Sequence, residues 1–147
     1  PRLPNKEGED LKRGKPMKSL VVEDDATCRT IMQAYLTPFG ECRLAENGRD
    51  ALAALAEAWE QGSPFDLVCL DIIMPEMDGH AVLAGIRDME AARGVTSPNG
   101  IKVIMTSGAG DIDHIAQSFE KDCVAYIVKP VLKSTLLETL KELRLIP

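Results

Sequence analysis

Residues 65–75 read Phe-Asp-Leu-Val-Cys-Leu-Asp-Ile-Ile-Met-Pro, and this stretch decides the fold of the chain. Its apolar run, Leu67 to Leu70, is followed at once by an acid, Asp71. A short apolar run between the turn residues Pro64 and Pro75 is typical of a strand buried on both faces. Asp71 would then lie at the carboxyl end of a central strand, where open α/β sheets place their ligand sites. Asp71 is therefore the candidate chemical centre.

The composition is that of one globular domain. Of the 147 residues, 45% are hydrophobic and 27% are charged, which is typical of a soluble chain with its own core. The net charge of -6 argues against direct binding of nucleic acid, which needs clustered cations. No stretch approaches the roughly 20 apolar residues that cross a bilayer, and no signal peptide opens the chain. We therefore expect a cytoplasmic protein with no membrane insertion.

The remaining sequence alternates between apolar runs and helical patterns. Residues 1–16 are polar and contain several Pro and Gly, so we expect a flexible tail, a linker or an expression remnant there, and a single domain over residues 17–147. The predicted strands are residues 18–22, 42–45, 67–70, 101–105 and 124–128. The predicted helices are residues 26–36, 49–61, 80–93, 111–121 and 134–143. This alternation predicts an α/β fold, with a parallel sheet, helices on both of its faces and right-handed crossovers.

The first predicted strand ends on three consecutive acids, Glu23, Asp24 and Asp25. Asp25 precedes a helical pattern and is expected to cap that helix. Glu23 and Asp24 have no such structural task. They fit either an acidic surface turn or a hard oxygen site suited to Mg²⁺. In the helix that follows, Ile31, Ala34 and Tyr35 have the spacing expected of its inward face.

Each unusual residue falls at the end of a predicted strand. Glu23 and Asp24 end the first strand, Asp71 the third, Thr106 the fourth and Lys129 the fifth. Because the carboxyl ends of parallel strands share one edge of a sheet, these side chains are expected to converge. The set suits phosphoryl transfer to a carboxylate, which acts as nucleophile and forms an acyl phosphate. Mg²⁺ and a lysine would neutralise the charge on the transferring group, and a hydroxyl would bond a phosphoryl oxygen.

Four motifs, in this order and spacing, make the chain resemble a response-regulator receiver domain of the two-component type. They are Leu20-Val21-Val22-Glu23-Asp24-Asp25, Asp71-Ile72-Ile73-Met74-Pro75-Glu76-Met77-Asp78-Gly79, Met105-Thr106-Ser107 and Tyr126-Ile127-Val128-Lys129-Pro130. The resemblance covers about residues 17–146. It implies a flavodoxin-like, doubly wound five-stranded parallel sheet in the order 2-1-3-4-5, which is the strand order of chemotaxis receivers.

The resemblance also implies a role for each motif residue. Asp71 matches the phosphoryl acceptor. The expected Mg²⁺ ligands are Asp71, Asp24, Glu23 (largely through a bound water) and the backbone carbonyl of Ile73. Thr106 matches the switch hydroxyl, Lys129 the phosphate-pairing lysine and Tyr126 the switch aromatic. The Lys129–Pro130 peptide bond is expected to be cis.

The implied function is a phosphorylation-controlled switch. A sensor histidine kinase or a phosphotransfer protein would donate the phosphoryl group to Asp71. Thr106 and Tyr126 would then move, and the surface built from the fourth helix, the fifth strand and the last helix would change its affinity for a downstream protein, whose identity the sequence does not give. No turnover of a separate substrate is expected. Ile73 is apolar where many relatives carry a polar residue, which suggests a long-lived phosphoryl group.

A stand-alone regulator is the preferred interpretation, and three alternatives remain beside it. The polar residues 1–16 also fit a receiver cut from a hybrid kinase or another larger regulator. A phosphohydrolase with an aspartyl-phosphate intermediate is disfavoured, because Ile73 stands where many such enzymes carry a second acid. A binding module that works without phosphorylation is disfavoured by the complete set Asp24, Asp71, Thr106 and Lys129.

Overall fold

The computed structural model describes residues 16–96, 100–108 and 125–147. The elements in chain order are β1 (Ser19–Val22), α2 (Ala26–Leu36), the 3₁₀ turn η2 (Thr37–Phe39), β2 (Cys42–Ala45), α3 (Gly48–Glu60), β3 (Leu67–Asp71), α4 (Gly79–Ala92), β4 (Lys102–Ser107), β5 (Ala125–Val128) and α6 (Lys133–Glu142). The strands form one parallel sheet in the order β2-β1-β3-β4-β5. This confirms the predicted α/β class and the order 2-1-3-4-5. Residues 1–15 of the expected tail and the helix expected at 111–121 lie outside the described residues.

β3 is the central strand, as its apolar run predicted. It pairs with β1 on one side and with β4 on the other, and all of its residues are buried. In register, Val22 of β1 lies beside Leu70, and Thr106 of β4 lies beside Asp71. The strand that carries Asp71 is therefore held on both sides, and its carboxyl end is fixed relative to its neighbours.

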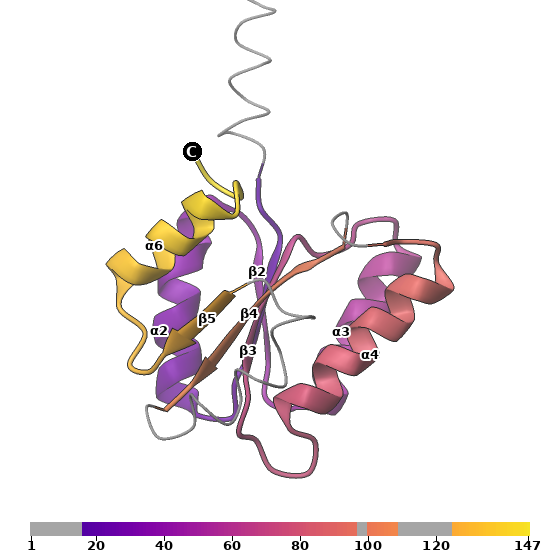
Figure 1. Ribbon diagram of the computed structural model, residues 1–147, viewed down its shortest axis with the longest axis horizontal. Helices are drawn as coiled ribbons and strands as arrows, with labels where there is room; N and C mark the ends of the chain where they lie inside the picture. The colour runs from indigo at the N-terminus through magenta and orange to yellow at the C-terminus, as the bar shows by residue number, and fades with distance from the viewer. Residues whose placement is uncertain (1–15, 97–99, 109–124) are drawn as a thin grey trace, which may run out of the picture.

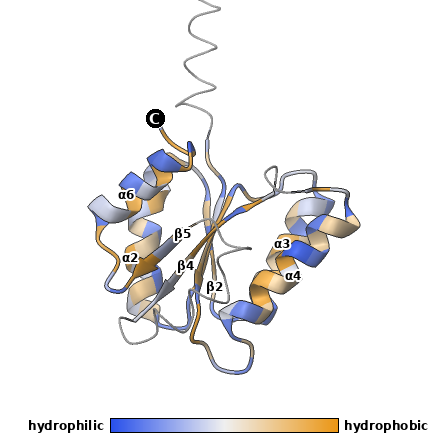
Figure 2. Cartoon of the chain, viewed as in Figure 1, coloured by the Kyte–Doolittle hydropathy of each residue, from blue (hydrophilic) through white to orange (hydrophobic). Residues whose placement is uncertain are grey.

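Helices cover both faces of the sheet, α2 and α6 on one face and α3 and α4 on the other (Figure 1). The alternation of side chains along a strand divides the core accordingly. Leu20 and Val22 face the α3–α4 side, whereas Val21 faces the α2–α6 side. Figure 2 shows the apolar residues of the helices turned toward the sheet. Each fully buried aliphatic side chain contributes about 1.5–3 kcal/mol, so this two-sided core is what holds the edge of the sheet in place.

Among the described helices, α2, α3 and α4 begin at a side-chain cap, and the caps of α2 and α4 lie in loops that follow the carboxyl ends of β1 and β3. Asp25 caps α2 by accepting a hydrogen bond from the backbone N–H of Cys28 at 2.8 Å, as expected from the sequence. Asp78 caps α4 by accepting from the backbone N–H of Ala81 at 3.0 Å, and Asn47 caps α3. These bonds satisfy backbone donors that a helix start leaves unpaired, and they fix where each loop after a strand ends.

The inward face predicted for α2 is wrong. Ile31 is 42% exposed and Ala34 is exposed, whereas Met32 and Leu36 are buried. Tyr35 is only half-buried. Two apolar stripes lie side by side on this helix, and spacing alone does not choose between them. Packing against the sheet and α6 selects the stripe of Met32 and Leu36, which leaves Ile31 on the surface.

The other element boundaries agree with the predicted ones to within about two residues, which is the usual uncertainty of helix and strand ends. Within the described ranges, no helix is long and apolar enough to cross a membrane.

Candidate functional site

The carboxyl edge of the sheet brings the predicted residues together. Glu23 directly follows β1, Asp71 ends β3, Thr106 lies beside Asp71 in β4, and Lys129 directly follows β5. The sequence places each of them at the end of an apolar run, and the parallel register aligns these ends at one edge.

Three carboxylates form a cluster at this edge. One carboxylate oxygen from each of Glu23, Asp24 and Asp71 lies within 4.8 Å of the other two. Glu23 and Asp71 are each only 4% exposed, whereas Asp24 is exposed. The cluster is therefore buried on the side of the core and open to solvent through Asp24.

Among the residues that the structure describes, Lys129 forms the ion pairs with both buried acids. Its Nζ lies 2.6 Å from Glu23 Oε1 and 3.3 Å from Asp71 Oδ1. Burial lowers the pKa of Lys129, but the hydrogen bonds to Glu23 and Asp71 and the charges of these two acids together outweigh burial, so the pKa of Lys129 is raised above its ordinary value. Lys129 therefore stays protonated at neutral pH. The Lys129–Pro130 peptide bond, expected from the sequence to be cis, is cis in the structure.

Asp71 has an unusual acidity. The pKa of Asp71 is raised from 3.8 to about 7. Burial is the largest cause of this shift and the charge of Glu23 is the second, while the charge of Lys129 opposes them. Two buried carboxylates with one ammonium between them leave negative charge without a full counter-charge. A cation bound at the cluster would relieve that repulsion and keep Asp71 ionised.

The donor set fits a hard divalent cation. Carboxylate oxygens are the ligands that Mg²⁺ prefers, and Mg²⁺ is usually held by one or two carboxylates together with water and phosphate oxygens. Glu23, Asp24 and Asp71 provide such oxygens at one place. Ile73 lies two residues beyond β3 with its side chain 59% exposed, and its carbonyl as a metal ligand stays a prediction.

Thr106 and Tyr126 are both near the site but differ in their surroundings. The side chain of Thr106 is buried beside Asp71 in register, and its carbonyl accepts a hydrogen bond from the backbone N–H of Ile72 at 3.0 Å. Tyr126 is half-buried against the α3–α4 core, and its hydroxyl shares a hydrogen bond with the hydroxyl of Ser107. Tyr126 is thus hydrogen-bonded to the residue directly after Thr106, and the switch roles expected for Thr106 and Tyr126 stay predictions.

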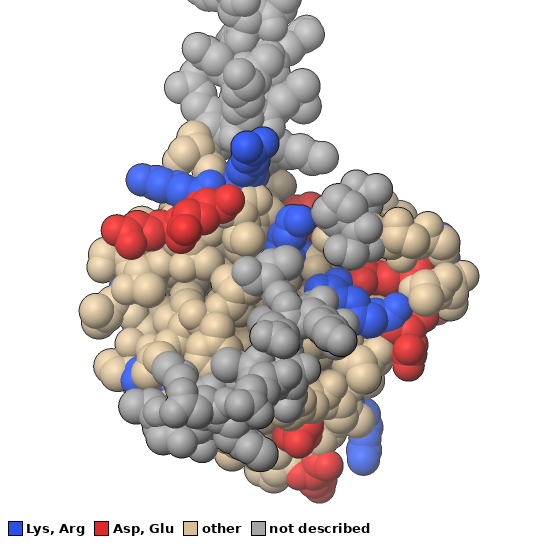
Figure 3. Space-filling view, viewed as in Figure 1, with Lys and Arg blue, Asp and Glu red and all other residues tan. Residues whose placement is uncertain are grey.

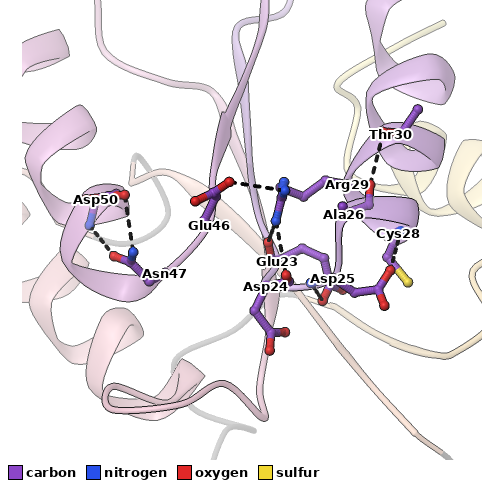
Figure 4. A network of polar contacts seen from close by, with 10 residues as sticks. All are labelled: Glu23, Asp24, Asp25, Ala26, Cys28, Arg29, Thr30, Glu46, Asn47 and Asp50. Atoms are coloured by element: carbon purple, nitrogen blue, oxygen red, sulfur yellow. Dashed lines mark hydrogen bonds and ion pairs between the residues drawn. The ribbon is translucent and has the colours of Figure 1, made fainter.

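Two polar residues near the site, Ser107 and Arg29, were given no role from the sequence. Ser107 is buried and bonds Tyr126, but a serine after a threonine at a strand end carries no distinctive sequence signal. Arg29 of α2 reaches back to the acidic segment and donates to the backbone carbonyls of Glu23 and Asp24 (Figure 4). Such a contact depends on how α2 leaves the sheet, which the spacing of residues does not reveal.

The backbone approaches closely behind Asp71. A Cβ atom on Gly79, at the start of α4, would lie 2.8 Å from the carbonyl oxygen of Asp71 and 2.8 Å from Cα of Ile72. The N–H of Gly79 donates to the carbonyl of Ile72 at 2.8 Å. Only glycine allows this approach, which closes the loop from β3 to α4 tightly behind Asp71.

A groove of about 220 Å³ leads to the site between α2 and the loop that joins β5 to α6. Glu23, Thr106 and Lys129 form its polar end, and the exposed apolar side chains Ile31 and Leu132 line its outer part. The groove therefore meets the site at Glu23, Thr106 and Lys129, whereas Asp24 and Asp71 are not among its lining residues.

Comparisons with known proteins agree with this geometry. A family model described as the response regulator receiver domain matches residues 19–141. The chain is 34% identical over 131 residues to the transcriptional regulatory protein ZraR of Salmonella typhimurium, covering 88% of this chain and 26% of that protein. It is 35% identical over 125 residues to the transcriptional regulatory protein AruR of Pseudomonas aeruginosa, covering 84% of this chain and 48% of that protein. The chain thus spans about a quarter to a half of these relatives.

Solved structures give the same result. The chemotaxis protein CheY4 of Vibrio cholerae superposes with a TM-score of 0.70 at 25% identity, covering 87% of this chain and 98% of that chain. A mutant of the receiver domain of the histidine kinase CKI1 from Arabidopsis thaliana superposes with a TM-score of 0.71 at 27% identity, covering 91% of each chain.

Proposed function

The chain belongs to the family of response regulator receiver domains, and from this premise we propose that it accepts a phosphoryl group on Asp71 from a histidine kinase or a phosphotransfer protein. The observation that carries the proposal is the position of Asp71: it is buried at the carboxyl end of the central strand, between a second buried acid and a lysine. Nothing in strand packing calls for a buried carboxylate there, whereas phosphoryl acceptance does.

In the proposed reaction, a carboxylate oxygen of Asp71 attacks the phosphorus of a phosphohistidine. The new O–P bond forms as the N–P bond breaks, and the imidazole nitrogen leaves with the electron pair. Asp71 must be ionised to attack. Lys129, held protonated by Glu23 and Asp71, pairs with the charge of the phosphoryl oxygens. Mg²⁺ bound by Glu23, Asp24, Asp71 and the carbonyl of Ile73 would supply further neutralisation of that charge.

Signalling is proposed to follow from a rearrangement next to Asp71. The phosphoryl oxygens attract the hydroxyl of Thr106, and Tyr126 changes its position in response. These changes shift the equilibrium between two conformations of the surface made by β5, α6 and residues 111–121. Residues 111–121 lie outside the described part of the chain. A downstream protein that binds one state better than the other reads the signal.

The output is proposed to act through protein binding in the cytoplasm, with no direct nucleic-acid contact by this domain. The net charge of -6 supports this proposal. In the view of Figure 3, basic and acidic side chains lie close to one another and form no continuous basic patch among the described residues. Because the chain covers only part of its curated relatives, any DNA-directed output of a longer protein would belong to another domain.

The proposal is tested by incubating the protein with acetyl phosphate and Mg²⁺ and recording its intact mass. The wild type is expected to gain one phosphoryl group, and Asp71→Asn is expected to gain none. Asp66→Asn is the matched control, because Asp66 directly precedes the opposite end of the same strand, where it accepts a hydrogen bond from the backbone N–H of Lys18. A wild type that gains nothing would favour a binding module that works without phosphorylation.

A further inference from the structure

Arg29 joins helix α2 to the acidic segment through the backbone. Its Nη1 donates to the carbonyl of Glu23 at 2.9 Å and to the carbonyl of Asp24 at 3.1 Å. Its Nη2 pairs with Glu46 at 3.3 Å, and its side chain is only 14% exposed. Figure 4 shows the guanidinium lying between the acidic segment and Glu46. A single side chain therefore clamps two successive peptide groups.

These two peptide groups belong to the residues that carry two of the clustered carboxylates. Glu23 is fixed through both oxygens of its carboxylate, since Oε1 accepts from Lys129 and Oε2 accepts from the backbone N–H of Asp25 at 3.1 Å. Asp24 is exposed, and its direction depends on the backbone that Arg29 holds. Loss of the clamp would leave the Asp24 backbone free to rotate its carboxylate away from Glu23 and Asp71.

We infer that Arg29 is a positioning residue for the divalent-cation site, one that aims the carboxylate of Asp24 by binding the backbone carbonyls of Glu23 and Asp24. This inference rests on the proposed function, because it takes the carboxylate cluster to be a metal site. Groups that orient metal ligands from outside the coordination sphere typically alter metal affinity by about 10- to 100-fold when they are removed.

The charge of Arg29 and its positioning of the acidic segment predict opposite changes in metal affinity when Arg29 is removed. A guanidinium near three carboxylates repels a divalent cation, so its charge alone predicts that removing Arg29 tightens metal binding. Positioning predicts that removing it weakens metal binding. The sign of the change therefore separates the two effects, and a purely structural role would lower the thermal stability without changing the affinity of the folded protein.

The test measures the dissociation constant for Mn²⁺ from the free-ion electron paramagnetic resonance signal, with competition by Mg²⁺. It is run at a temperature where circular dichroism shows every variant folded. We expect Arg29→Met to bind Mn²⁺ about 10-fold more weakly than the wild type. Arg29→Gln loses the charge but keeps a shorter hydrogen-bond donor, so its affinity for Mn²⁺ is expected to lie between those of the wild type and Arg29→Met. If Arg29→Met does not fold, Arg29→Gln shows whether the affinity falls or rises.

Two controls separate charge from position. Arg43→Met removes the same charge at a half-exposed residue of β2 that pairs with Glu57 and is expected to bind Mn²⁺ like the wild type. Glu46→Gln breaks the ion pair but leaves both carbonyl contacts and is expected to change the affinity by less than about 2-fold.

Failure of the inference can be told apart from failure of the proposed function. If the wild type binds Mn²⁺ and the Arg29 variants bind it equally well or more tightly, Arg29 does not position the site. If the wild type itself binds no Mn²⁺, or Asp71→Asn binds it as well as the wild type does, the metal site of the proposed function fails first.

Discussion

Lys129 is shared unequally between two acids: its ammonium lies 2.6 Å from Glu23 and 3.3 Å from Asp71. The closer bond goes to the acid that is not the proposed acceptor. The contact of Lys129 with Asp71 is therefore longer than its contact with Glu23. The shorter bond to Glu23 holds the lysine beside the proposed acceptor. The same ammonium is the only positive charge that the described residues place within ion-pair distance of Asp71, so its removal should have large electrostatic effects.

Replacing Lys129 should make the protein more dependent on a divalent cation. Lys129→Met leaves Glu23 and Asp71 buried without a counter-charge, and we expect a loss of about 2 kcal/mol of unfolding free energy at neutral pH. Because Mg²⁺ can replace the missing charge, Mg²⁺ should raise the melting temperature of the variant more than that of the wild type. Thermal unfolding with and without Mg²⁺ measures this, and equal increments for the two proteins would contradict it.

The acidity of Asp71 makes the stability of the metal-free protein depend on pH. In the folded protein the pKa of Asp71 is about 7 instead of 3.8, so folding favours its protonated form. The resulting stabilisation is complete below about pH 4 and is lost as the pH rises through about 7. Asp71→Asn removes this dependence and should stabilise the protein by about 2 kcal/mol more at pH 8 than at pH 5. Urea unfolding in EDTA at the two pH values measures the difference, and a gain that does not grow with pH would refute the assignment.

The bond between Ser107 and Tyr126 should be measurable as an energetic coupling. Ser107→Ala and Tyr126→Phe each remove one partner of the same hydrogen bond and are expected to cost about 1 kcal/mol each. The double variant should cost little more than either single one, because the bond can be lost only once. Chemical denaturation of the four proteins gives the coupling energy. Strictly additive losses would mean that the two hydroxyls do not interact in solution.

Ile73 is expected to control the lifetime of the phosphoryl group. Ile73 is 59% exposed and lies two residues after Asp71, where we expect its apolar side chain to limit the ordering of water for attack on the phosphorus. Ile73→Asn supplies a group that can orient such a water and should hydrolyse the phosphoryl group several-fold faster, which corresponds to a barrier lower by about 1 kcal/mol. Phosphate release from the phosphorylated proteins gives the two rates. Equal rates, or a faster rate for the wild type, would reject this role.

Much of the fold could be predicted from the sequence because its strands are short apolar runs between turn residues. The central position of Leu67–Asp71 and the convergence of Glu23, Asp24, Asp71 and Lys129 follow from strand order and from the shared edge of a parallel sheet. Both features depend on the sheet topology, which the alternation of apolar runs and helical patterns in the sequence predicts.

Contacts set by the packing of a helix against the sheet could not be predicted in this way. The spacing of Ile31 and Tyr35 predicts the wrong inward face for α2, because the neighbouring residues Met32 and Leu36 are also apolar and spaced one helical turn apart. The contacts of Arg29 with the acidic segment follow from the same helix orientation and were missed for the same reason. A choice between two apolar stripes depends on the surface that receives them, and that surface is assembled from distant parts of the chain.

The central claim is that the phosphoryl group is attached to Asp71, and reductive trapping tests it most directly. Borohydride reduces an aspartyl phosphate to homoserine, whereas it leaves an ionised aspartate unchanged. The protein is treated with acetyl phosphate and Mg²⁺, reduced, digested and sequenced by mass spectrometry. The account predicts homoserine at position 71 and aspartate at positions 24, 25 and 66. Homoserine at another position, or none at all in a protein that has gained phosphate, would contradict it.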